Sequence, residues 1–466
     1  MDEFKIFRDP IYGYIRIDKK YCIHFIDTDI FQRLRRIEQT SMRILYPSAH
    51  HDRFAHSIGV FHLGQIAFLN LKNNSRSGII DSEEDWKKYQ VTFEIACLLH
   101  DCGHSPFSHT FEFLYMQEKK NEKVRNELYS FFDRNEFDSI FAKKLPPEHE
   151  LISALVMLKK FSRQIEEVGG DPLLAARMIM GFKHHKGILS SKQHFENRLI
   201  SLLNGSAFDI DSLDYTQRDS WASGVSNVEI DYQRLLSALM IKEDKYNIPR
   251  IAFKKSALSV LENISIGRNF LYKWIYNHHI VLYEQYILVK IIKIIDQISE
   301  GKFCEKVFSI DSFFDTVKFG KYNFYLPADD DLLYTIKSFS SHGIPEIDEY
   351  LTRNYRYKAL WKTHFELNSL FPESVNIQKI MGAFTNGELD DTYHRDSMIW
   401  LEASPKEKGI SNGEMFIDID GELVDAVQAT SFNKDKLAYP ILYVQAKPDL
   451  RKNKSDIIRH LLRLQK

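Results

Sequence analysis

Three short stretches of the chain carry side chains that together could bind a metal ion. HHDRFAHSIGV contributes His56, LLHDCGHSPFSH contributes His100 and Asp101, and FDIDSLDYTQRD contributes Asp211. Two or three imidazoles with two carboxylates form a borderline nitrogen and oxygen set that suits Zn, Fe, Mn, Ni or Co. An isolated His-Asp pair is common on protein surfaces. Because further candidate ligands stand at compatible places on separate segments, the sequence favours a site for a divalent transition metal, without distinguishing which one.

The adjacency of His100 and Asp101 restricts how such a site can be built. Neighbouring helix positions point about 100° apart, so these two side chains share an ion only if it lies over the edge between their faces. Asp211, Tyr215 and Asp219 are spaced i, i+4, i+8 and therefore stay close to one helix face. Since each of the three stretches begins or continues a helix, a helical bundle could direct all of them at one point.

The composition is that of an ordinary globular protein. The chain has 466 residues, of which 44% are hydrophobic, and this length allows roughly two to four domains. Lys and Arg (62) nearly balance Asp and Glu (64), so the net charge of −2 gives no indication of nucleic-acid or membrane binding. Any site for an anion must therefore be local. The four scattered cysteines favour a reducing compartment.

We expect no targeting or membrane-spanning segment. The start, MDEFKIFRDP, is polar and lacks a positively charged region followed by an apolar stretch. No segment reaches the ~18 uninterrupted apolar residues of a membrane span. These features predict a soluble, cytoplasmic protein without a membrane partner.

Helical periodicity dominates the chain. Apolar residues recur at helical spacing in Asp29–Gln39, with an Asp cap, and in His56–Leu71, Thr92–His100, His149–Leu158 and Arg198–Leu203. A longer helix is expected through YEQYILVKIIKIIDQIS. Lys72–Lys88 is expected to be a surface loop. The charge-rich stretch Gln117–Lys144 is interpreted as an exposed insertion.

The character of the chain changes after the long helix. GEMFIDIDGEL and YPILYVQAK show the alternation and β-branched content typical of strands, so a small mixed α/β region is expected roughly between residues 370 and 466. The expected fold is therefore mainly α, a helical bundle with a smaller C-terminal mixed α/β region. We expect two domains, 1–300 and 301–466, and the sequence indicates no role for the second.

Eight short blocks of the chain, in their order and spacing, resemble the HD-domain phosphohydrolase superfamily. They are FRDPIYGYIRID, IDTDIFQRLRRIEQT, HHDRFAHSIGV, LLHDCGHSPFSHTF, EHE, DIDSLDYTQRD, DYQRL and GRNFLYKWIYNHHIV. Within that superfamily they are most similar to the deoxynucleoside triphosphate triphosphohydrolases of the SAM-and-HD-domain and bacterial dGTP triphosphohydrolase types. The resemblance covers about the first 290 residues. It implies an HD-domain helical bundle as the core of residues 1–300.

The resemblance also implies roles for individual residues. The implied metal ligands are His56, His100, Asp101 and Asp211. The implied catalytic residues are His149, which transfers a proton, Glu150, which holds it, and His104. The implied substrate contacts are to phosphate from Arg53, His104, His109, Tyr215 and Arg268, to the sugar 3′-hydroxyl from Gln39 and Asp219, and by stacking from Tyr276. A guanine-nucleotide regulatory site between subunits is implied at Lys5, Ile6, Asp27, Gln32, Arg35 and Arg234.

Several of these residues also fit a purely structural interpretation. Tyr276 could equally belong to the core. Arg53 and Arg268 could be solvated surface arginines. Asp27 could simply cap the helix that starts near Asp29.

The chain departs from the family at two phosphate-contacting lysines. Ser212 and His279 stand in their places, which puts the triphosphate preference in doubt. Lys273, His278 or His279 could compensate, and a histidine would do so in a pH-dependent way because its charge changes near neutrality.

The resemblance implies a metal-dependent phosphohydrolase that converts dNTPs to deoxynucleoside and triphosphate. Mg²⁺ could accompany the nucleotide phosphates, and a homodimer or tetramer regulated by guanine nucleotide is expected. Three alternatives stay open: an HD-type phosphodiesterase or nuclease, a 5′-nucleotidase, and a nucleotide sensor with weak or no turnover. The products separate these readings. Free triphosphate indicates the triphosphohydrolase, nucleoside monophosphate indicates the nuclease or phosphodiesterase, and nucleotide binding without turnover indicates the sensor.

Overall fold

The computed structural model describes residues 3–75, 80, 82–142, 145–185, 187–205, 208–225, 229–371, 379–380, 398–403, 415–419, 421–429, 439–445, 458–459 and 461. The chain forms two compact units that are each discontinuous in sequence. The first comprises Met1–Arg268, Asp296–Tyr334 and Lys408–Asn433, and the second comprises Asn269–Ile295, Thr335–Glu407 and Lys434–Lys466. These units do not follow a single cut near residue 300, so the two-domain division stays a prediction. The expectation of a mainly α fold with a smaller mixed α/β region is confirmed.

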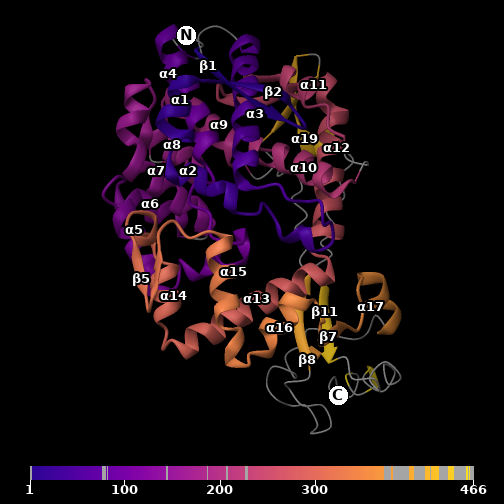
Figure 1. Cartoon of the computed structure of the whole chain (residues 1–466). Helices are drawn as coiled ribbons and strands as arrows, with labels where there is room; N and C mark the ends of the chain where they lie inside the picture. Colours follow the sequence, from indigo (N-terminus) through magenta and orange to yellow (C-terminus); the bar gives the residue numbers. More distant parts are fainter. Residues whose placement is uncertain are drawn as a thin grey trace. The chain divides into compact units, whose positions relative to one another are not determined.

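The first unit consists mainly of helices (Figure 1). Its longer helices are α3 (Arg53–Asn74), α4 (Glu83–Leu99), α7 (Glu148–Glu167), α8 (Pro172–Met180), α9 (Ser191–Leu203) and α10 (Ile210–Ser223). Its shorter helices are α1 (Lys19–Tyr21), α2 (Asp29–Arg33), α5 (Glu118–Leu128), α6 (Arg134–Phe141), α11 (Tyr232–Ser237), α14 (Lys302–Val307) and α19 (Ala426–Ala429). Helices α12 (Leu258–Leu271) and α15 (Asp329–Ser338) each contain a boundary between the units.

Small sheets complete the first unit. A hairpin of β1 (Phe4–Asp9) and β2 (Gly13–Asp18) begins the chain. A four-stranded sheet has the order β10-β9-β4-β3, formed by β3 (Leu239–Glu243), β4 (Pro249–Lys254), β9 (Phe416–Ile419) and β10 (Glu422–Asp425). Strands β4 and β9 run parallel and the other neighbours run antiparallel. A short hairpin joins β5 (Val317–Phe319) and β6 (Tyr322–Phe324).

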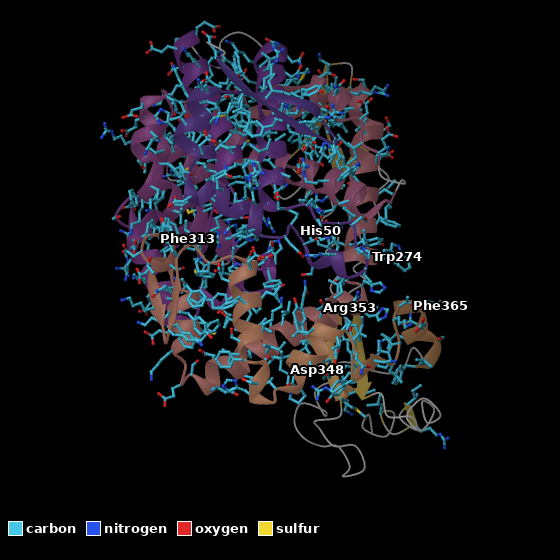
Figure 2. All side chains as sticks on the ribbon, in the orientation of Figure 1. His50, Trp274, Phe313, Asp348, Arg353 and Phe365 are labelled. Atoms are coloured by element: carbon cyan, nitrogen blue, oxygen red, sulfur yellow. The ribbon has the colours of Figure 1, made fainter. Side chains whose placement is uncertain are left out.

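Helix α3 lies in the core of this unit. Asp52 caps it by accepting a hydrogen bond from the Ala55 amide, and residues 56–61 are all buried, so neighbours surround the helix on every side. By length and composition α3 could span a membrane, but 67% of its most apolar window is buried inside the protein, as expected for a core helix. Phe313, labelled in Figure 2, is another fully buried side chain of this unit.

Four predicted helices are confirmed. The segments beginning at His56, Thr92, His149 and Arg198 lie in α3, α4, α7 and α9, which extend beyond the predicted bounds. The predicted helix Asp29–Gln39 is too long.

Helix α2 ends at Arg33, and only a single 3-10 turn, η2 (Leu34–Arg36), follows it. Thr28, not Asp29, is the N-cap. The helix stops because Ile37 is extended and Glu38 forms a β-bridge with Asp52.

One prediction about a surface segment is wrong at its ends. The loop predicted at Lys72–Lys88 is helical at both ends, because α3 continues to Asn74 and Ser82 caps α4, and residues 76–79 and 81 lie outside the described part of the chain. The segment predicted as an exposed insertion, about residues 117–144, contains α5 and α6; most of its described side chains are exposed or half-buried, and that it is an insertion stays a prediction.

Val124 and Leu128, spaced i, i+4, and Phe137 are buried, and the Phe137 ring lies 5.4 Å from that of Phe182. The many charges of this segment conceal an apolar face of ordinary helical spacing. Residues 143–144 lie outside the described part of the chain.

The second unit contains α13 (His279–Ile298) over most of its length, α16 (Pro345–Thr352) and α17 (His364–Leu370). Its antiparallel sheet has the order β7-β11-β8, with β7 (Tyr357–Ala359), β8 (Met398–Ala403) and β11 (Tyr439–Gln445). Helix α13 confirms the predicted long helix. The two predicted C-terminal strands are also present over their described residues, as β9–β10 and β11, but they belong to sheets in different units.

Candidate active site

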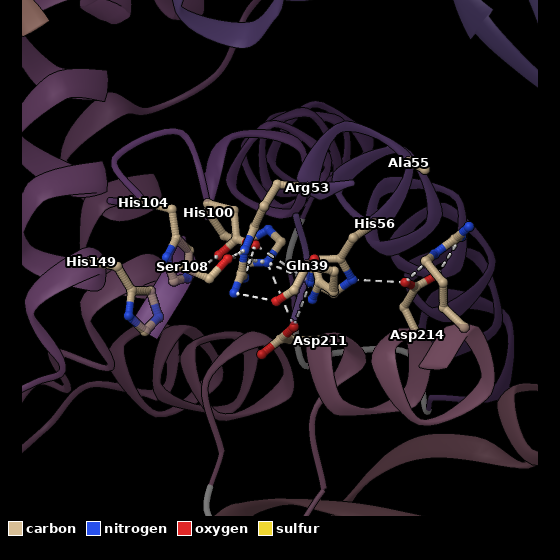
Figure 3. A network of polar contacts seen from close by, with 12 residues as sticks. Gln39, Arg53, Ala55, His56, His100, His104, Ser108, His149, Asp211 and Asp214 are labelled. Atoms are coloured by element: carbon tan, nitrogen blue, oxygen red, sulfur yellow. Dashed lines mark hydrogen bonds and ion pairs between the residues drawn. The ribbon is translucent and has the colours of Figure 1, made fainter. Parts of the chain in front are cut away.

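Four predicted metal ligands come together in the first unit (Figure 3). His56 Nε2 lies 3.3 Å from His100 Nε2 and 2.9 Å from Asp211 Oδ1. Asp101 Oδ1 lies 3.4 Å from His100 Nε2. Ligands held about 2.0–2.2 Å from one ion stand at such separations from each other. His56, His100 and Asp101 are buried, whereas 37% of the Asp211 side chain is exposed, which leaves access from solvent.

The ends of three helices position these side chains. His56 lies in the first turn of α3, and Asp211 lies in the first turn of α10, which Asp209 caps. Helix α4 ends at Leu99, and His100 is its C-cap. The chain therefore turns where His100 and Asp101 stand, and this turn directs two adjacent side chains toward one point.

The Nδ1 atom of each imidazole, on the side away from the cluster, has its own hydrogen-bond partner. His56 Nδ1 lies 2.7 Å from Asp214 Oδ2, and His100 Nδ1 lies 2.9 Å from the Cys97 carbonyl oxygen. Both partners are hydrogen-bond acceptors, so each ring keeps a proton on Nδ1, and a ring that gives up its other proton to an ion would present the Nε2 lone pair to the cluster. Asp214 is itself held by Arg218 Nε at 2.8 Å and by the Tyr12 hydroxyl at 2.8 Å. The donor set and its orientation therefore fit a divalent cation.

The electrostatics of the cluster also favour a cation. Burial alone would lower the pKa of His56, but its hydrogen bonds to Asp211 and Asp214 raise that pKa to about 10. Burial likewise opposes ionisation of Asp101, yet the Arg53 guanidinium holds the pKa of this carboxyl well below its usual range. The pocket thus binds a proton tightly, and a metal ion would take the place of that proton.

A second cluster surrounds the carboxylate of Glu112. Its Oε1 lies 2.9 Å from His104 Nδ1, 2.9 Å from His109 Nδ1 and 3.1 Å from His149 Nδ1. The His104 and His149 rings are stacked, with centroids 4.2 Å apart. These four donors lie within 4.8 Å of one another, so a cation could also bridge them.

The charges in this second cluster are distributed unequally. Burial would lower the pKa of His149, but the Glu112 charge raises it to about 9. Burial, Arg53 and His149 hold the pKa of His104 well below its usual range. Despite burial, the charges of His109 and His149 hold the pKa of Glu112 well below its usual range. At neutral pH the cluster therefore pairs a protonated His149 with an ionised Glu112 and a neutral His104.

The carboxylate close to His149 Nδ1 in this geometry is that of Glu112, at 3.1 Å, whereas Glu150 accepts a hydrogen bond from Asn204 Nδ2 at 2.7 Å. The charge of Glu150 also raises the pKa of His149, and its role in holding His149 stays a prediction. Sequence reasoning missed Glu112, and its spacing three residues after His109 was the available signal.

Arg53 is buried and fixed by three hydrogen bonds, so the surface interpretation of this arginine is wrong. Its Nη1 donates to Asp101 Oδ2 at 2.6 Å, its Nε to Ser108 Oγ at 3.0 Å, and its Nη2 to the Gln39 carbonyl at 3.1 Å. The Gln39 side chain is also buried, and no donor among the described residues reaches its Oε1. Arg268 is buried as well, on α12.

The remaining substrate residues divide between the two units. Asp219 is buried in α10 with its Oδ1 2.6 Å from His51 Nε2, a partner that sequence reasoning did not assign. Tyr215 is half-buried on the same helix. The Ser212 hydroxyl donates to the Asp209 carbonyl, so it is used inside the helix.

Tyr276, Lys273, His278 and His279 belong to the second unit, and their approach to this site stays a prediction. Burial, His278 and Lys362 lower the pKa of His279 to about 4. His279 is therefore neutral at pH 7 and does not replace the fixed charge of a lysine.

Four of the six predicted regulatory residues form two separate pairs. Lys5 forms an ion pair with Asp27. Arg35 Nε donates to Gln32 Oε1 at 2.9 Å, and its guanidinium lies over the Phe54 ring. Ile6 is 60% exposed, and Arg234 on α11 donates to the Ser256 carbonyl. Since Thr28 caps α2, the interpretation of Asp27 as its cap is wrong.

Comparisons with known proteins agree with this geometry. Residues 53–216 match the family described as HD domain, a range that contains all four candidate metal ligands. An uncharacterized MG461 homolog of Mycoplasma pneumoniae is 31% identical over 274 residues, 58% of this chain and 56% of that protein. The deoxynucleoside triphosphate triphosphohydrolase SAMHD1 of Danio rerio is 31% identical over 284 residues, 60% of this chain and 43% of that protein. The chain thus spans about half the length of these relatives.

Two solved structures share the fold. A hypothetical protein from Aquifex aeolicus has a TM-score of 0.63 at 22% identity, covering 97% of this chain and all of that one. A phosphohydrolase from Bacteroides thetaiotaomicron has a TM-score of 0.64 at 20% identity, covering 96% of this chain and all of that one. At these identities the similarity is one of fold.

Proposed function

Because the chain belongs to the HD-domain phosphohydrolase superfamily, we propose that it hydrolyses deoxynucleoside triphosphates at the α-phosphorus, giving a deoxynucleoside and inorganic triphosphate. The observation that carries this proposal is the position of Asp101 between the two clusters. Its Oδ1 lies 3.4 Å from His100 Nε2 and 3.6 Å from His104 Nε2. A cation pocket therefore adjoins a histidine cluster that contains one protonated member, His149, as metal-assisted phosphoester hydrolysis requires.

His56, His100, Asp101 and Asp211 would hold the metal ion. A divalent ion supplies Lewis acidity toward the phosphoryl oxygen and acidifies water near neutral pH. His149 stands ready as the general acid, because Glu112 raises its pKa to about 9 and keeps it protonated. When water attacks the α-phosphorus and the bond to the 5′-oxygen breaks, His149 gives its proton to that oxygen.

Arg53 and the loop that carries His104 and His109, here called the histidine loop, bind the phosphates in this proposal. The guanidinium of Arg53 is held in place by Asp101, Ser108 and Gln39, so little reorganisation is needed when charge develops on the phosphate chain. Gln39 offers a buried Oε1 that can accept a hydrogen bond from the sugar 3′-hydroxyl. His51 fixes Asp219 for the same task.

One observation favours a second candidate with fewer phosphate contacts. Ser212 and a neutral His279 stand where the family has phosphate-contacting lysines. A 5′-nucleotidase or phosphodiesterase needs less fixed positive charge than a triphosphohydrolase. The similarity to the deoxynucleoside triphosphate triphosphohydrolase SAMHD1 of Danio rerio supports the triphosphohydrolase, and the match covers 43% of that protein.

Product analysis tests the proposed function. The purified chain is incubated with each dNTP, NTP, single-stranded DNA and a cyclic dinucleotide, with Mn²⁺ or Mg²⁺, and products are identified by chromatography and mass. Free triphosphate with deoxynucleoside is the expected result, and Asp211→Ala is the matched inactive control. Nucleoside monophosphate would indicate the diesterase, phosphate released from monophosphates the nucleotidase, and binding without turnover a sensor.

A further inference from the structure

We infer that Asp329 is a positioning residue for this site: its carboxylate joins the two loops that hold Arg53. The inference rests on the proposed function. It concerns a part of the chain, beyond residue 300, for which the sequence indicated no role. Residues Asp296–Tyr334 belong to the same compact unit as the HD domain, so this contact lies within one unit.

Asp329 is the first residue of α15 and is 9% exposed. Its Oδ1 accepts a hydrogen bond from the Phe107 amide at 2.6 Å, and its Oδ2 accepts one from the Glu38 amide at 2.9 Å. Within the first turn of its own helix it is Asp331 whose Oδ2 accepts from a backbone amide, that of Ala328. Asp329 therefore uses both of its oxygens on loops far away in sequence.

These two loops hold the Arg53 side chain in place through hydrogen bonds. Ser108 follows Phe107, and its Oγ accepts from Arg53 Nε and donates to the Glu38 carbonyl. Gln39 follows Glu38, and its carbonyl accepts from Arg53 Nη2. Each hydrogen bond of Asp329 is thus one residue away from a hydrogen bond of Arg53.

The Phe107 loop needs such a restraint. Phe107 and Ser108 have φ values of 55° and 52°, in the left-handed region that side-chain-bearing residues disfavour. The hydrogen bond from the Phe107 amide to Asp329 stabilises this conformation. The same loop carries His104 and His109, so its position also sets the histidine cluster.

Arg33 joins the loop that contains Phe107 to the chain just before α15 at a second point. It is 4% exposed, its Nε donates to the Pro327 carbonyl at 2.8 Å, and its Nη2 donates to the His104 carbonyl at 2.7 Å. Its guanidinium lies 4.8 Å from the centre of the Phe313 ring. The histidine loop is therefore anchored at His104 by Arg33 and at Phe107 by Asp329.

The two amide donors favour the ionised form of Asp329. Burial, with a smaller effect of the Glu38 charge, raises its pKa to about 7 against the opposing effect of the Glu38 and Phe107 amides and of the Arg33 charge. An ionised carboxylate accepts on both oxygens, whereas an amide in its place would face one N–H donor with its own NH₂ group. Asp329→Asn therefore releases one of the two loops with almost no change in volume.

The test compares Asp329→Asn with Asp330→Asn, which makes the same change at the next, exposed position of α15. Two readouts are used: dNTP turnover, and the affinity for inorganic tripolyphosphate, which requires no hydrolysis. Asp329→Asn is expected to weaken both by about 10-fold or more, with metal content unchanged. Asp330→Asn is expected to match the wild type. Wild-type tripolyphosphate affinity in Asp329→Asn would overturn the inference.

A double-mutant cycle separates positioning from general stability. If Asp329 acts through Arg53, Asp329→Asn costs less than about 2-fold in an Arg53→Ala background, whereas equal losses in both backgrounds would overturn the inference. Should Asp329→Asn not fold, Ser108→Ala replaces it, because this change removes the hydroxyl that links Arg53 to the Glu38 carbonyl. Ser108→Ala is expected to give the same loss of tripolyphosphate affinity, and an unchanged affinity would overturn the inference. Absence of dNTP turnover in the wild type would contradict only the proposed function, since tripolyphosphate binding still tests the positioning role.

Discussion

Asp211 and Asp214 stand three residues apart on α10 and have different tasks. Asp211 faces the candidate ion, whereas Asp214 holds His56 Nδ1. Asp211→Ala should abolish metal binding and turnover with an unchanged circular dichroism spectrum. Asp214→Asn keeps all four ligands and should weaken metal affinity by about 10-fold to 100-fold, the usual cost of losing a ligand's orienting partner. Stoichiometric metal and wild-type rate in Asp211→Ala would show that the ligand assignment is wrong.

The proposed role of His149 predicts a particular dependence on pH. A general acid works in its protonated form, so kcat should fall as the pH rises through about 9, the pKa to which Glu112 raises His149. Glu112→Gln removes that negative charge, which lowers the pKa and moves the alkaline limb toward lower pH by about one unit or more. Glu122→Gln, at an exposed position on α5, is the control. An unshifted limb in Glu112→Gln would assign the proton to another group.

The sugar contacts predict selectivity against substrates without a 3′-hydroxyl. A buried polar group that is left unpaired penalises the wrong substrate, and a dideoxynucleotide would leave Gln39 Oε1 without a donor. Dideoxynucleotides should be poor substrates in the wild type, and Gln39→Ala should reduce the discrimination. Competition between dATP and ddATP measures it, and equal turnover of the two by the wild type would remove the sugar-reading role.

The chemistry of individual ligands could be predicted from the sequence, whereas their supporting partners could not. His56, His100, Asp101 and Asp211 are recognisable because their residue types and the order of their blocks are local properties. Glu112 approaches His149, and His51 approaches Asp219, only when separated segments meet. The spacing of Glu112 three residues after His109 is a local signal, but it does not name His149 as the partner, for which the resemblance suggested Glu150.

At the scale of elements, the site is built from helix ends. The start of α3, the end of α4 and the start of α10 each expose polar side chains where the backbone leaves the helix. The end of α4 was predicted to within one residue, whereas the start of α3 was placed at His56, three residues after Arg53. Caps such as Asp52 and Asp209 carry short-range signals that could have located these ends. The extent of α2 was not predictable, because the β-bridge between Glu38 and Asp52 that ends it depends on a tertiary contact.

Gly59 allows α3 and α10 to approach closely enough to place His56. A Cβ atom at this position would overlap Asp214 Oδ1 and Arg218 Nη2, the groups that orient His56. Gly59→Ala should destabilise the protein by about 1–3 kcal/mol and should also reduce metal content. Gly64→Ala, on the same helix, meets the Cys97 sulfur at 2.7 Å and should lower stability while metal stays bound. Thermal unfolding with metal analysis separates the two, and full metal occupancy in Gly59→Ala contradicts this account.

At the scale of the whole molecule, the HD domain is not a self-contained segment. Residues 296–334 and the β9–β10 hairpin complete the unit that carries the site. Sequence reasoning identified β9–β10 as strands from their alternation, but it could not indicate that they join β4 rather than β11. Strand partners are set by long-range packing, which leaves no periodic trace in either strand alone.

The last prediction concerns regulation by guanine nucleotide. Asp27 is exposed and paired with Lys5, and a carboxylate can accept from both N–H donors on the Watson–Crick edge of guanine, which adenine lacks. A guanine nucleotide would therefore replace Lys5 as the partner of Asp27 and leave that lysine for phosphate. Arg35 would also bind phosphate, as planar guanidinium groups do well. Exposed ion pairs contribute little to stability, so breaking the Lys5–Asp27 pair to bind the nucleotide costs little free energy.

A ligand can favour an assembly only by its differential affinity for the assembled state. GTP or dGTP should therefore shift the chain toward a dimer or tetramer and accelerate dATP hydrolysis by about 5-fold or more, and Asp27→Ala should respond to neither. Light scattering and dATP turnover across a GTP titration measure both effects, with ATP as the control nucleotide. If neither guanine nucleotide changes mass or rate in the wild type, or if Asp27→Ala responds as the wild type does, the Lys5–Asp27 pair serves only to attach β1 to the end of the short helix η1 (Cys22–Ile26).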